Sequence, residues 1–314
     1  MLERLQRLRR DLHQIPELDF DLPETTRYVR RVLEMLPCEV FSPDGHGLCA
    51  WFDAGKTEAV AFRSDMDALP ICEVTGVPFA SKHAGKMHAC GHDGHMAMVL
   101  ELAHQIAAVK DRLTKNVLLV FQPAEETTGG ARLICESGVF GERNVKAIYG
   151  FHLWPDLPMG AVATRPGPLL ARANEITVDF EGRSTHIAKS EDGADALLAA
   201  AKFVVQADLM LAGLRAEEGP WCTLKFGKLT SGTVRNAIAA HGHLEGSLRV
   251  FSDAAYEKAW ARLHEIAGEI STELGVKITI TGSAGYPPVI NDAELFEDAR
   301  RRIPELEVLE KPLL

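Results

Sequence analysis

An excess of basic residues and a long uninterrupted apolar run are two features that this sequence lacks. Its 314 residues carry 34 Lys and Arg against 44 Asp and Glu, a formal net charge of −10. That balance gives no electrostatic reason to bind nucleic acid or an anionic membrane. The most apolar stretch, residues 194–214, has the pattern of an amphipathic helix, because four polar residues interrupt it: Asp195, Lys202, Gln206 and Asp208. We therefore expect a small-molecule partner, with no nucleic acid and no membrane.

Paired cysteines and a signal peptide are also missing. The six cysteines, at positions 38, 49, 72, 90, 135 and 222, form no C-x-x-C motif. Such scattered cysteines are expected for reduced thiols in a large cytosolic domain. The Arg-rich N-terminus is followed by no apolar stretch of signal-peptide length. We therefore expect a cytoplasmic protein.

Two common catalytic motifs are absent as well. The chain has no G-x-S-x-G sequence to place a serine nucleophile, and no glycine pattern of the P-loop or dinucleotide type. Neither serine-based acyl transfer nor nucleotide binding is therefore supported, and the chemistry has to come from other groups.

Helix-like and strand-like segments alternate over residues 1–155. The predicted strands are short, continuous apolar runs, at residues 47–52, 59–63, 117–121 and 145–151. Runs of this kind are typical of strands buried on both faces of a sheet. The predicted helices lie at residues 24–36, 93–110 and 129–137, with Asp93 as the N-cap of the second. This pattern predicts an α/β core.

A different kind of sheet begins at residue 174. Ile176, Val178 and Phe180 alternate with polar residues, which predicts a strand with one solvated face. The pattern then predicts a helix, two strands, a helix and a strand, at residues 194–214, 223–229, 241–250, 254–274 and 276–280. The order β-α-β-β-α-β is that of a ferredoxin-like domain. A helix at 292–302 and a strand at 306–309 follow, and the chain length also favours two domains.

The densest cluster of potential ligands is HACGHDGH at residues 88–95. Cys90 and His92 lie two residues apart at the entry to a helix, so both side chains could reach one metal ion. Thiolate and imidazole together suit zinc or another borderline divalent ion better than magnesium or calcium. A polar helix start is the structural alternative, and a cysteine nucleophile paired with His92 or His95 is a third interpretation.

Further polar residues follow the predicted strands directly. Glu125 and Glu126 follow one strand and His152 follows another, and sites in open α/β sheets form at such strand ends. Adjacent carboxylates on an extended segment point in different directions, so one could hold a metal while the other faces its bound water as general base. Solvated surface is the alternative for this pair.

Asp65 and Asp67 lie at the end of a third strand. A carboxylate there could hydrogen-bond a ligating histidine and fix its orientation, whereas the alternative is a turn or a helix cap. His186 lies in a loop from which it could donate a hydrogen bond to a developing oxyanion, although a loop histidine is more often simply solvated. The remaining histidines, at positions 13, 46, 83, 104, 241, 243 and 264, have no candidate partner at a motif spacing. We expect them to be structural.

At these residues the chain resembles the M20 metallopeptidase family, in its amidohydrolase branch of N-acetyldiaminopimelate deacetylases, hippurate hydrolases and plant auxin-conjugate hydrolases. The matching stretches are RRDLHQIPE at 9–17, FRSDMDALP at 62–70, MHACGHD at 87–93, FQPAEE at 121–126, GFHLW at 150–154 and RPGP at 165–168. The resemblance implies metal-dependent hydrolysis of N-acyl amino acids, such as N-acetyldiaminopimelate or hippurate.

The resemblance also implies the metal site. Two divalent metal ions, of Zn, Mn, Ni or Co, are expected on four residues: Cys90, His92, Glu126 and His152. Glu125 is then the general base, and Asp65 is the supporting catalytic residue.

The implied fold is an open mixed-sheet metallohydrolase domain, residues 1–172 and 284–314, with an inserted ferredoxin-like lid and dimerisation domain at residues 173–283. In the lid, His186, Asn236 and Arg249 are expected to bind substrate, and a homodimer is expected to form through this domain.

The sequence differs from the family pattern in two places. Relatives continue through a late histidine ligand that is not present here, so the C-terminal part of the catalytic domain is expected to be missing. The alternative function is therefore a truncated, catalytically impaired homologue that acts as a dimeric binding remnant. The sequence AKSE after residue 187 also differs from the deacetylase pattern, which leaves the acyl group and the amino acid open.

Overall fold

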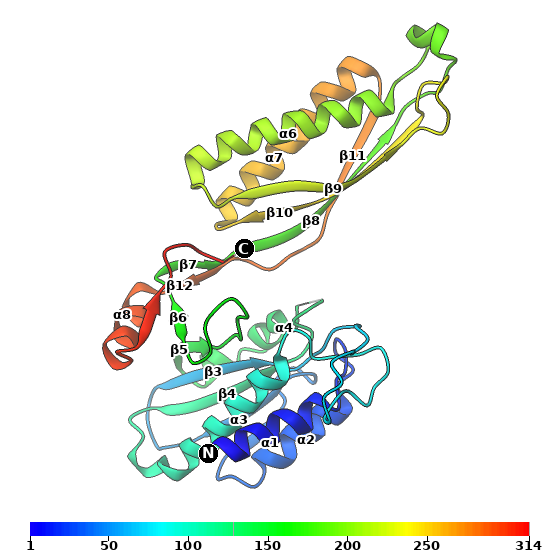
Figure 1. Ribbon diagram of the computed structural model, residues 1–314. Coiled ribbons are helices and arrows are strands. Elements are labelled where there is room, and N and C mark those ends of the chain that lie inside the picture. Colours follow the sequence, from blue (N-terminus) through cyan, green and yellow to red (C-terminus); the bar gives the residue numbers. More distant parts are fainter. Residues whose placement is uncertain (128, 314) are drawn as a thin grey trace. The chain divides into compact units, whose positions relative to one another are not determined.

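The computed structural model describes residues 1–127 and 129–313, and the chain divides into two units, Met1–Asp156 and Leu157–Leu314. Both units combine sheets with helices, as Figure 1 shows. The mixed α/β fold predicted from the sequence is confirmed.

A five-stranded mixed sheet forms the centre of the first unit, in the order β1-β2-β4-β3-β5. Its strands are β1 (Glu39–Phe41), β2 (Leu48–Phe52), β3 (Ala59–Asp65), β4 (Asn116–Gln122) and β5 (Val145–Gly150). β3 pairs in parallel with β4 and β5, whereas β2 is antiparallel to β1 and β4. Every residue of β4 is buried, because this strand has neighbours on both sides and helices on both faces.

Helices cover both faces of this sheet. One face carries α1 (Leu2–His13), α2 (Pro23–Leu33) and α3 (His92–Ala108), which is followed by the short helix η1 (Lys110–Arg112). The other face carries α4 (Gly130–Glu136) and α5 (Val139–Glu142). Figure 1 shows α1, α2 and α3 together below the sheet and α4 above it. Two apolar clusters, one on each face, therefore hold the strands in place.

The start of α3 differs from the prediction. Gly91, with a φ of +90°, is the residue before the helix, and no side chain in the described part of the chain caps it. Asp93 lies inside the first turn, where its carboxylate accepts hydrogen bonds from His13 and Arg9. The prediction of Asp93 as N-cap is therefore wrong, because long-range partners occupy its side chain.

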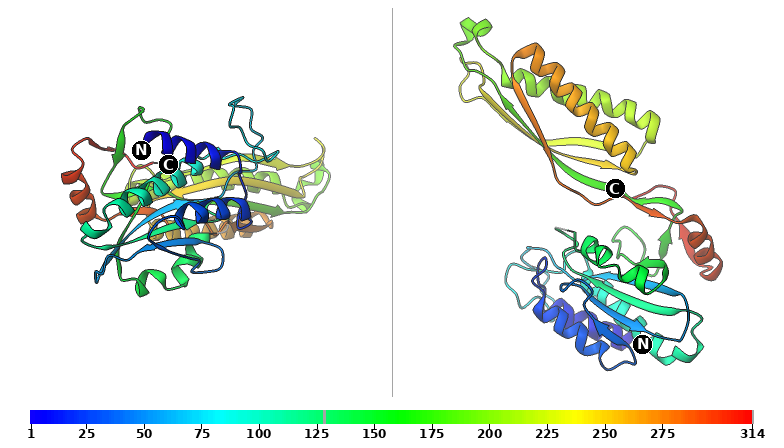
Figure 2. Two further views of the ribbon diagram at one scale, coloured as in Figure 1. Left: turned by 90° about the horizontal axis from the view of Figure 1, so that it is seen from below. Right: turned by 180° about the vertical axis from the view of Figure 1, so that it is seen from behind.

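A four-stranded antiparallel sheet with two helices forms the main body of the second unit. Its elements are β8 (Arg172–Glu181), η2 (Ile187–Asp192), α6 (Ala196–Glu218), β9 (Thr223–Ser231), β10 (His241–Val250), α7 (Asp253–Leu274) and β11 (Lys277–Gly282). The strand order in the sheet is β11-β8-β10-β9. Along the chain, these strands and the two long helices follow the predicted order β-α-β-β-α-β. Figures 1 and 2 both show α6 and α7 on the same face of this sheet, where Ile176, Val178 and Phe180 are buried.

α6 is long and apolar enough to span a membrane by length and composition alone, with a mean hydropathy of 1.7 over an 18-residue window. A core helix meets the same criterion. Here Phe203, Ala207 and Leu211 are buried against the sheet, while Leu197, Val205 and Leu209 of the same helix are exposed. The helix is therefore a packing element of the second unit with one apolar side left open.

Short strands complete the second unit. These are β6 (Val162–Thr164), β7 (Gly167–Leu170), β12 (Val289–Asn291) and β13 (Leu306–Val308), with α8 (Ala293–Arg302) between the last two. β12 pairs with β7, and β13 pairs with β6, so the segments before and after the four-stranded sheet lie side by side. Nothing in the described residues marks the expected loss of a C-terminal part, and that expectation stays a prediction.

Candidate active site and metal centre

The carboxyl ends of three parallel strands bring the candidate residues of the first unit together. Asp65 of β3 lies opposite Gln122 of β4, and Arg63 of β3 lies opposite Gly150 of β5. The segments that follow these strands therefore leave the sheet at one edge, next to the first turn of α3. This is the edge at which ligands bind in open α/β sheets.

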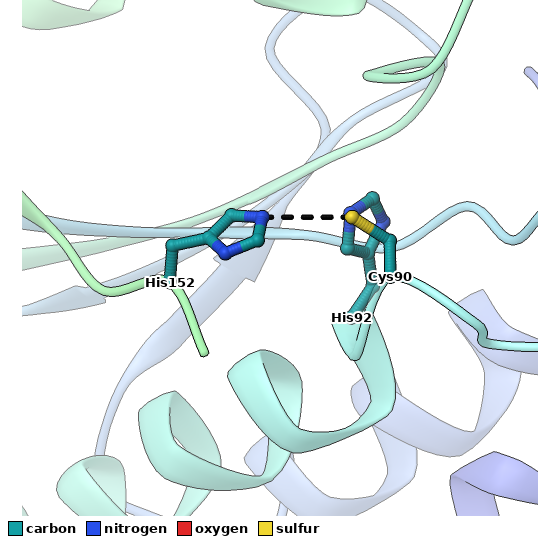
Figure 3. Close-up of side chains that lie close together, drawn as sticks. All are labelled: Cys90, His92 and His152. Carbon is teal, nitrogen blue, oxygen red and sulfur yellow. Dashed lines mark hydrogen bonds between the residues drawn. The ribbon is translucent and has the colours of Figure 1, made fainter. Parts of the chain in front are cut away.

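Cys90, His92 and His152 point toward one another, as Figure 3 shows. The Sγ atom of Cys90 lies 3.5 Å from Nε2 of His152, and one ligand atom from each of the three residues lies within 4.8 Å of the others. The three side chains come from the loop before α3, its first residue and the segment after β5. The sequence placed the first two together, and the parallel sheet adds the third.

Backbone carbonyls orient both histidine rings. The Nδ1–H group of His92 donates to the carbonyl oxygen of Asp67 at 2.8 Å, and that of His152 donates to the carbonyl oxygen of Leu153 at 2.7 Å. Because a carbonyl can only accept, each ring carries its proton on Nδ1 and keeps a lone pair on Nε2. This is the arrangement found in metal-ligating histidines.

Glu125 and Glu126 converge on the same point. Their carboxylates lie 3.8 and 3.7 Å from Nε2 of His92. The expectation that the two point in different directions is wrong, because the segment turns here instead of continuing the strand: Ala124 has a φ of +49°. The pKa of Glu125 is raised, mainly because the side chain is partly buried and also because the negative charges of Asp65 and Glu126 are close.

The turn at Glu125 is fixed by Asp67, which is fully buried. Its two carboxylate oxygens accept the backbone N–H groups of Glu125 at 2.9 Å and of Glu126 at 3.0 Å. The sequence suggested that this carboxylate would orient a ligating histidine. In the structure the carbonyl of Asp67 does so, and its carboxylate holds the Glu pair.

Asp65 is also fully buried, and both of its carboxylate oxygens are engaged. Oδ1 lies 2.7 Å from Nδ1 of His95, and Oδ2 accepts from Arg63 at 2.7 Å. Burial opposes ionisation, but the hydrogen bond from His95 and the charge of Arg63 hold the pKa of Asp65 well below its ordinary value. This residue is therefore a carboxylate in the folded protein.

The donor set fits a borderline divalent cation. Nε2 of His92 and Oε1 of Glu126 are buried and have no hydrogen-bond partner among the described residues, and the thiol of Cys90 faces both. Imidazole, carboxylate and thiolate are the ligands of zinc and of similar ions. A cation would satisfy these atoms, which a protein interior otherwise rarely leaves unpaired.

The cysteine-nucleophile interpretation loses support at the same site. Burial, and then the charge of Glu126, raises the pKa of Cys90 to about 12, whereas a nucleophilic cysteine needs a thiolate at neutral pH. A cation would supply the positive charge that stabilises the thiolate. The surroundings of Cys90 therefore favour a ligand over a nucleophile.

The predicted substrate-binding residues lie in the second unit. His186 and Asn236 are neighbours there. His186 forms an isolated antiparallel β-bridge with Ala237, and the backbone N–H group of Ile187 donates to the carbonyl oxygen of Asn236 at 3.1 Å. Arg249 lies on β10, opposite Ala173 of β8. Their roles toward a substrate stay predictions.

Residues 61–312 match the family model of the M20/M25/M40 peptidases. The chain belongs to this family. An N-acetyldiaminopimelate deacetylase of Lacticaseibacillus paracasei is 37% identical over 301 residues, covering 93% of this chain and 77% of the relative. A protein of the same name from Shouchella clausii is 37% identical over 297 residues, covering 92% and 77%.

A solved structure adds to this family assignment. A dinuclear metal-binding M20 peptidase of Bacillus subtilis is similar with a TM-score of 0.82 and 31% identity, covering 99% of this chain and 82% of that one. The resemblance noted from the sequence motifs is therefore confirmed. This M20 chain is an enzyme that hydrolyses amides.

Proposed function

We propose that this M20 enzyme removes the acyl group from an N-acyl amino acid, releasing a carboxylic acid and the free amino acid. N-acetyldiaminopimelate-like and hippurate-like compounds are the proposed substrates, and the names of the deacetylase relatives support the first. The observation that carries the proposal is the convergence of Cys90, His92 and His152 with two carboxylates at one sheet edge. The alternative of a binding remnant is not favoured by these relatives.

Cys90, His92, Glu126 and His152 are the proposed ligands of two divalent metal ions, of Zn, Mn, Ni or Co. The dinuclear relative from Bacillus subtilis supports the number. The position is supported by Nε2 of His92 and Oε1 of Glu126, which have no hydrogen-bond partner within residues 1–127 and 129–313. Bound metal would lower the pKa of a water molecule and polarise the amide carbonyl.

Glu125 is the proposed general base. Its carboxylate lies beside the Nε2 atom of His92, and 34% of its side chain is exposed, so that water and substrate can reach it. It would accept a proton from the attacking water and donate it to the leaving amine. Asp65 is proposed to support this step with its buried negative charge.

The second unit is proposed to supply a lid and the dimer contact, through residues 173–283. The catalytic domain would then comprise residues 1–172 and 284–314. The pairing of β6 and β7 with β13 and β12 supports placing the segments on either side of the lid in one domain. His186 is the proposed donor to the oxyanion, and Asn236 and Arg249 are proposed to bind the substrate carboxylate. We also propose that the enzyme works in the cytoplasm.

The exposed apolar side of α6 supports a homodimer. Leu209 is 68% exposed on this helix, and a second copy could cover it. Light scattering of Leu209→Lys should then give a smaller mass than the wild type. Met35→Lys, at a residue that is 70% exposed in the first unit, is the matched control and should leave the mass unchanged. Equal masses for all three proteins would contradict this contact.

Metal analysis together with substrate assays tests the reaction. We expect acetate release from N-acetyldiaminopimelate or benzoate release from hippurate, lost with a chelator and restored by added metal. Cys90→Ser should lose both metal and activity, whereas Cys135→Ser, at an exposed cysteine, should retain both. Activity that resists chelator but is blocked by thiol alkylation would reject the metal proposal in favour of a cysteine nucleophile.

A further inference from the structure

His95 lies next to the proposed metal ligands but cannot serve as one. Its ring is buried, and it forms a compact group with Asp65 and His92. The backbone N–H group of Leu153 donates to its Nε2 atom at 2.8 Å. Since that lone pair is occupied, Nε2 carries no proton and Nδ1–H must donate to Asp65 at 2.7 Å. Both ring nitrogens are therefore used within the protein.

The backbone of Leu153 links His95 to His152. Its N–H group is held by His95, and its carbonyl oxygen accepts the Nδ1–H group of His152 at 2.7 Å. The ring of His152 is thereby turned so that Nε2 lies 3.5 Å from the sulfur of Cys90. His152 itself is exposed. Its ring contacts the rings of His95 and Trp154, and the backbone hydrogen bond to Leu153 fixes which ring nitrogen faces Cys90.

Two glycine residues at the start of α3, one before the helix and one in its first turn, let Leu153 approach. A Cβ atom at Gly94 would lie 2.8 Å from Cδ1 of Leu153, and one at Gly91 would lie 3.2 Å from it. The absence of a Cβ atom at these two positions therefore leaves room for the side chain of Leu153. Asp65 anchors the other side of His95 and is itself bonded to Arg63, which donates to Gln122 at 2.8 Å. The chain of contacts thus spans β3, β4, α3 and the segment after β5.

We propose that His95 is a positioning residue that acts through the backbone of Leu153 to aim His152 at the metal, and that Asp65 fixes the tautomer of His95. The inference rests on the proposed function, because it requires His152 to be a ligand. Residues that orient metal-ligating histidines typically change metal affinity by about 10–100-fold when they are substituted.

Two substitutions separate the two halves of the His95 contact. Gln places its terminal oxygen near the position of Nε2, where it can accept from Leu153. Asn places its amide near the position of Nδ1, where it can reach only Asp65. The proposal predicts that His95→Gln binds metal more tightly than His95→Asn, and that Asn loses about 10–100-fold in affinity.

Cobalt titration of the full chain measures this affinity directly. The absorption band of a cobalt–thiolate bond reports binding at Cys90, and Cys90→Ser should abolish it. His104→Gln, a substitution on the same helix at a partly exposed residue, is the control and should bind like the wild type. Urea unfolding of each variant records its stability separately from its metal affinity.

A double-mutant comparison distinguishes positioning from a general structural role. In a His152→Ala background, His95→Asn should lower cobalt affinity by less than twofold further, because the ring that it positions is gone. An equal loss in both backgrounds, or tighter binding by Asn than by Gln, would overturn the proposal.

Failure of the proposed function gives a different result. If wild type shows no cobalt–thiolate band, or if His152→Ala binds cobalt like wild type, the metal site itself is wrong and this inference falls with it. If Cys90 and His152 both bind cobalt but His95→Asn binds like wild type, only the positioning role is rejected.

Discussion

The carboxylate of Asp67 offers the sharpest test of how the Glu125–Glu126 turn is held. Its two oxygens accept two consecutive backbone N–H groups at 2.9 and 3.0 Å, and the residue is 0% exposed. Asp67→Asn keeps the shape but replaces one acceptor by an NH₂ donor. One buried N–H group would then face another donor.

The expected cost follows from these contacts. A hydrogen bond to a charged group contributes roughly 1.5–3 kcal/mol, and a buried N–H group left unpaired costs about 1–3 kcal/mol. Because the turn can relax in part, we expect Asp67→Asn to lower the free energy of unfolding of the first unit by about 2–4 kcal/mol. A displacement of about 1 Å at Glu125 should also lower kcat by about 100-fold.

Urea unfolding monitored by circular dichroism and a deacylation assay measure the two effects. Asp53→Asn is the matched control, since the carboxylate of Asp53 accepts one backbone N–H, from Gly55 at 2.7 Å, on an exposed loop. We expect it to change the free energy of unfolding by less than about 0.5 kcal/mol. If Asp67→Asn behaves like this control in stability, or loses stability without losing kcat, the reasoning about the turn is refuted.

Three further predictions concern the base, a buried histidine and a close backbone contact. Glu125→Gln should abolish turnover while the metal content stays at the wild-type level, and an unchanged rate would remove Glu125 from its proposed role. The hydrogen bond to Asp93 raises the pKa of His13 above its ordinary value of about 6.5. The protonated His13 ring therefore stabilises the folded protein fully below about pH 6.5, and this stabilisation is lost as the pH rises through the raised pKa. The urea midpoint of wild type should accordingly fall between pH 6 and pH 9 more than that of His13→Gln, and equal falls would count against this linkage. Gly130→Ala should destabilise the protein by about 1–3 kcal/mol, because its Cβ would lie 2.0 Å from the carbonyl oxygen of Pro123; Gly141→Ala, which meets nothing within 4 Å, should be neutral or slightly stabilising in the same urea experiment.

Local sequence pattern was sufficient for the main elements. The continuous apolar runs at β2, β3 and β4 predict strands, and these strands are wholly or largely buried. β5 is also a strand as predicted, but its residues alternate between half-buried and exposed, so the expectation of burial on both faces is wrong for it. β1 was missed, since its three residues are too few to show a period. The alternation in β8 predicted one covered face, which α6 and α7 occupy.

The ligand candidates were also accessible to sequence reasoning, for a topological reason. Cys90 and His92 are close in the chain, and His152 follows a strand that pairs in parallel with β3. Parallel strands end at one edge of the sheet, so residues that follow such strands meet there, whatever their separation in sequence.

The orientation of these side chains was decided only by the tertiary structure. The sequence could not show that Ala124 would turn the chain so that both Glu125 and Glu126 face His92. Nor could it show that His95 would accept a hydrogen bond from Leu153, 58 residues away, and so be unavailable to a metal.

The sequence by itself thus determined the main helices and strands and which edge of the sheet carries the polar residues, because both depend on local pattern and strand direction. Only the tertiary structure decided which atom of each residue faces the site. That choice depends on single hydrogen bonds between distant segments, such as those of Asp67 with Glu125 and of His95 with Leu153, and no local pattern encodes them.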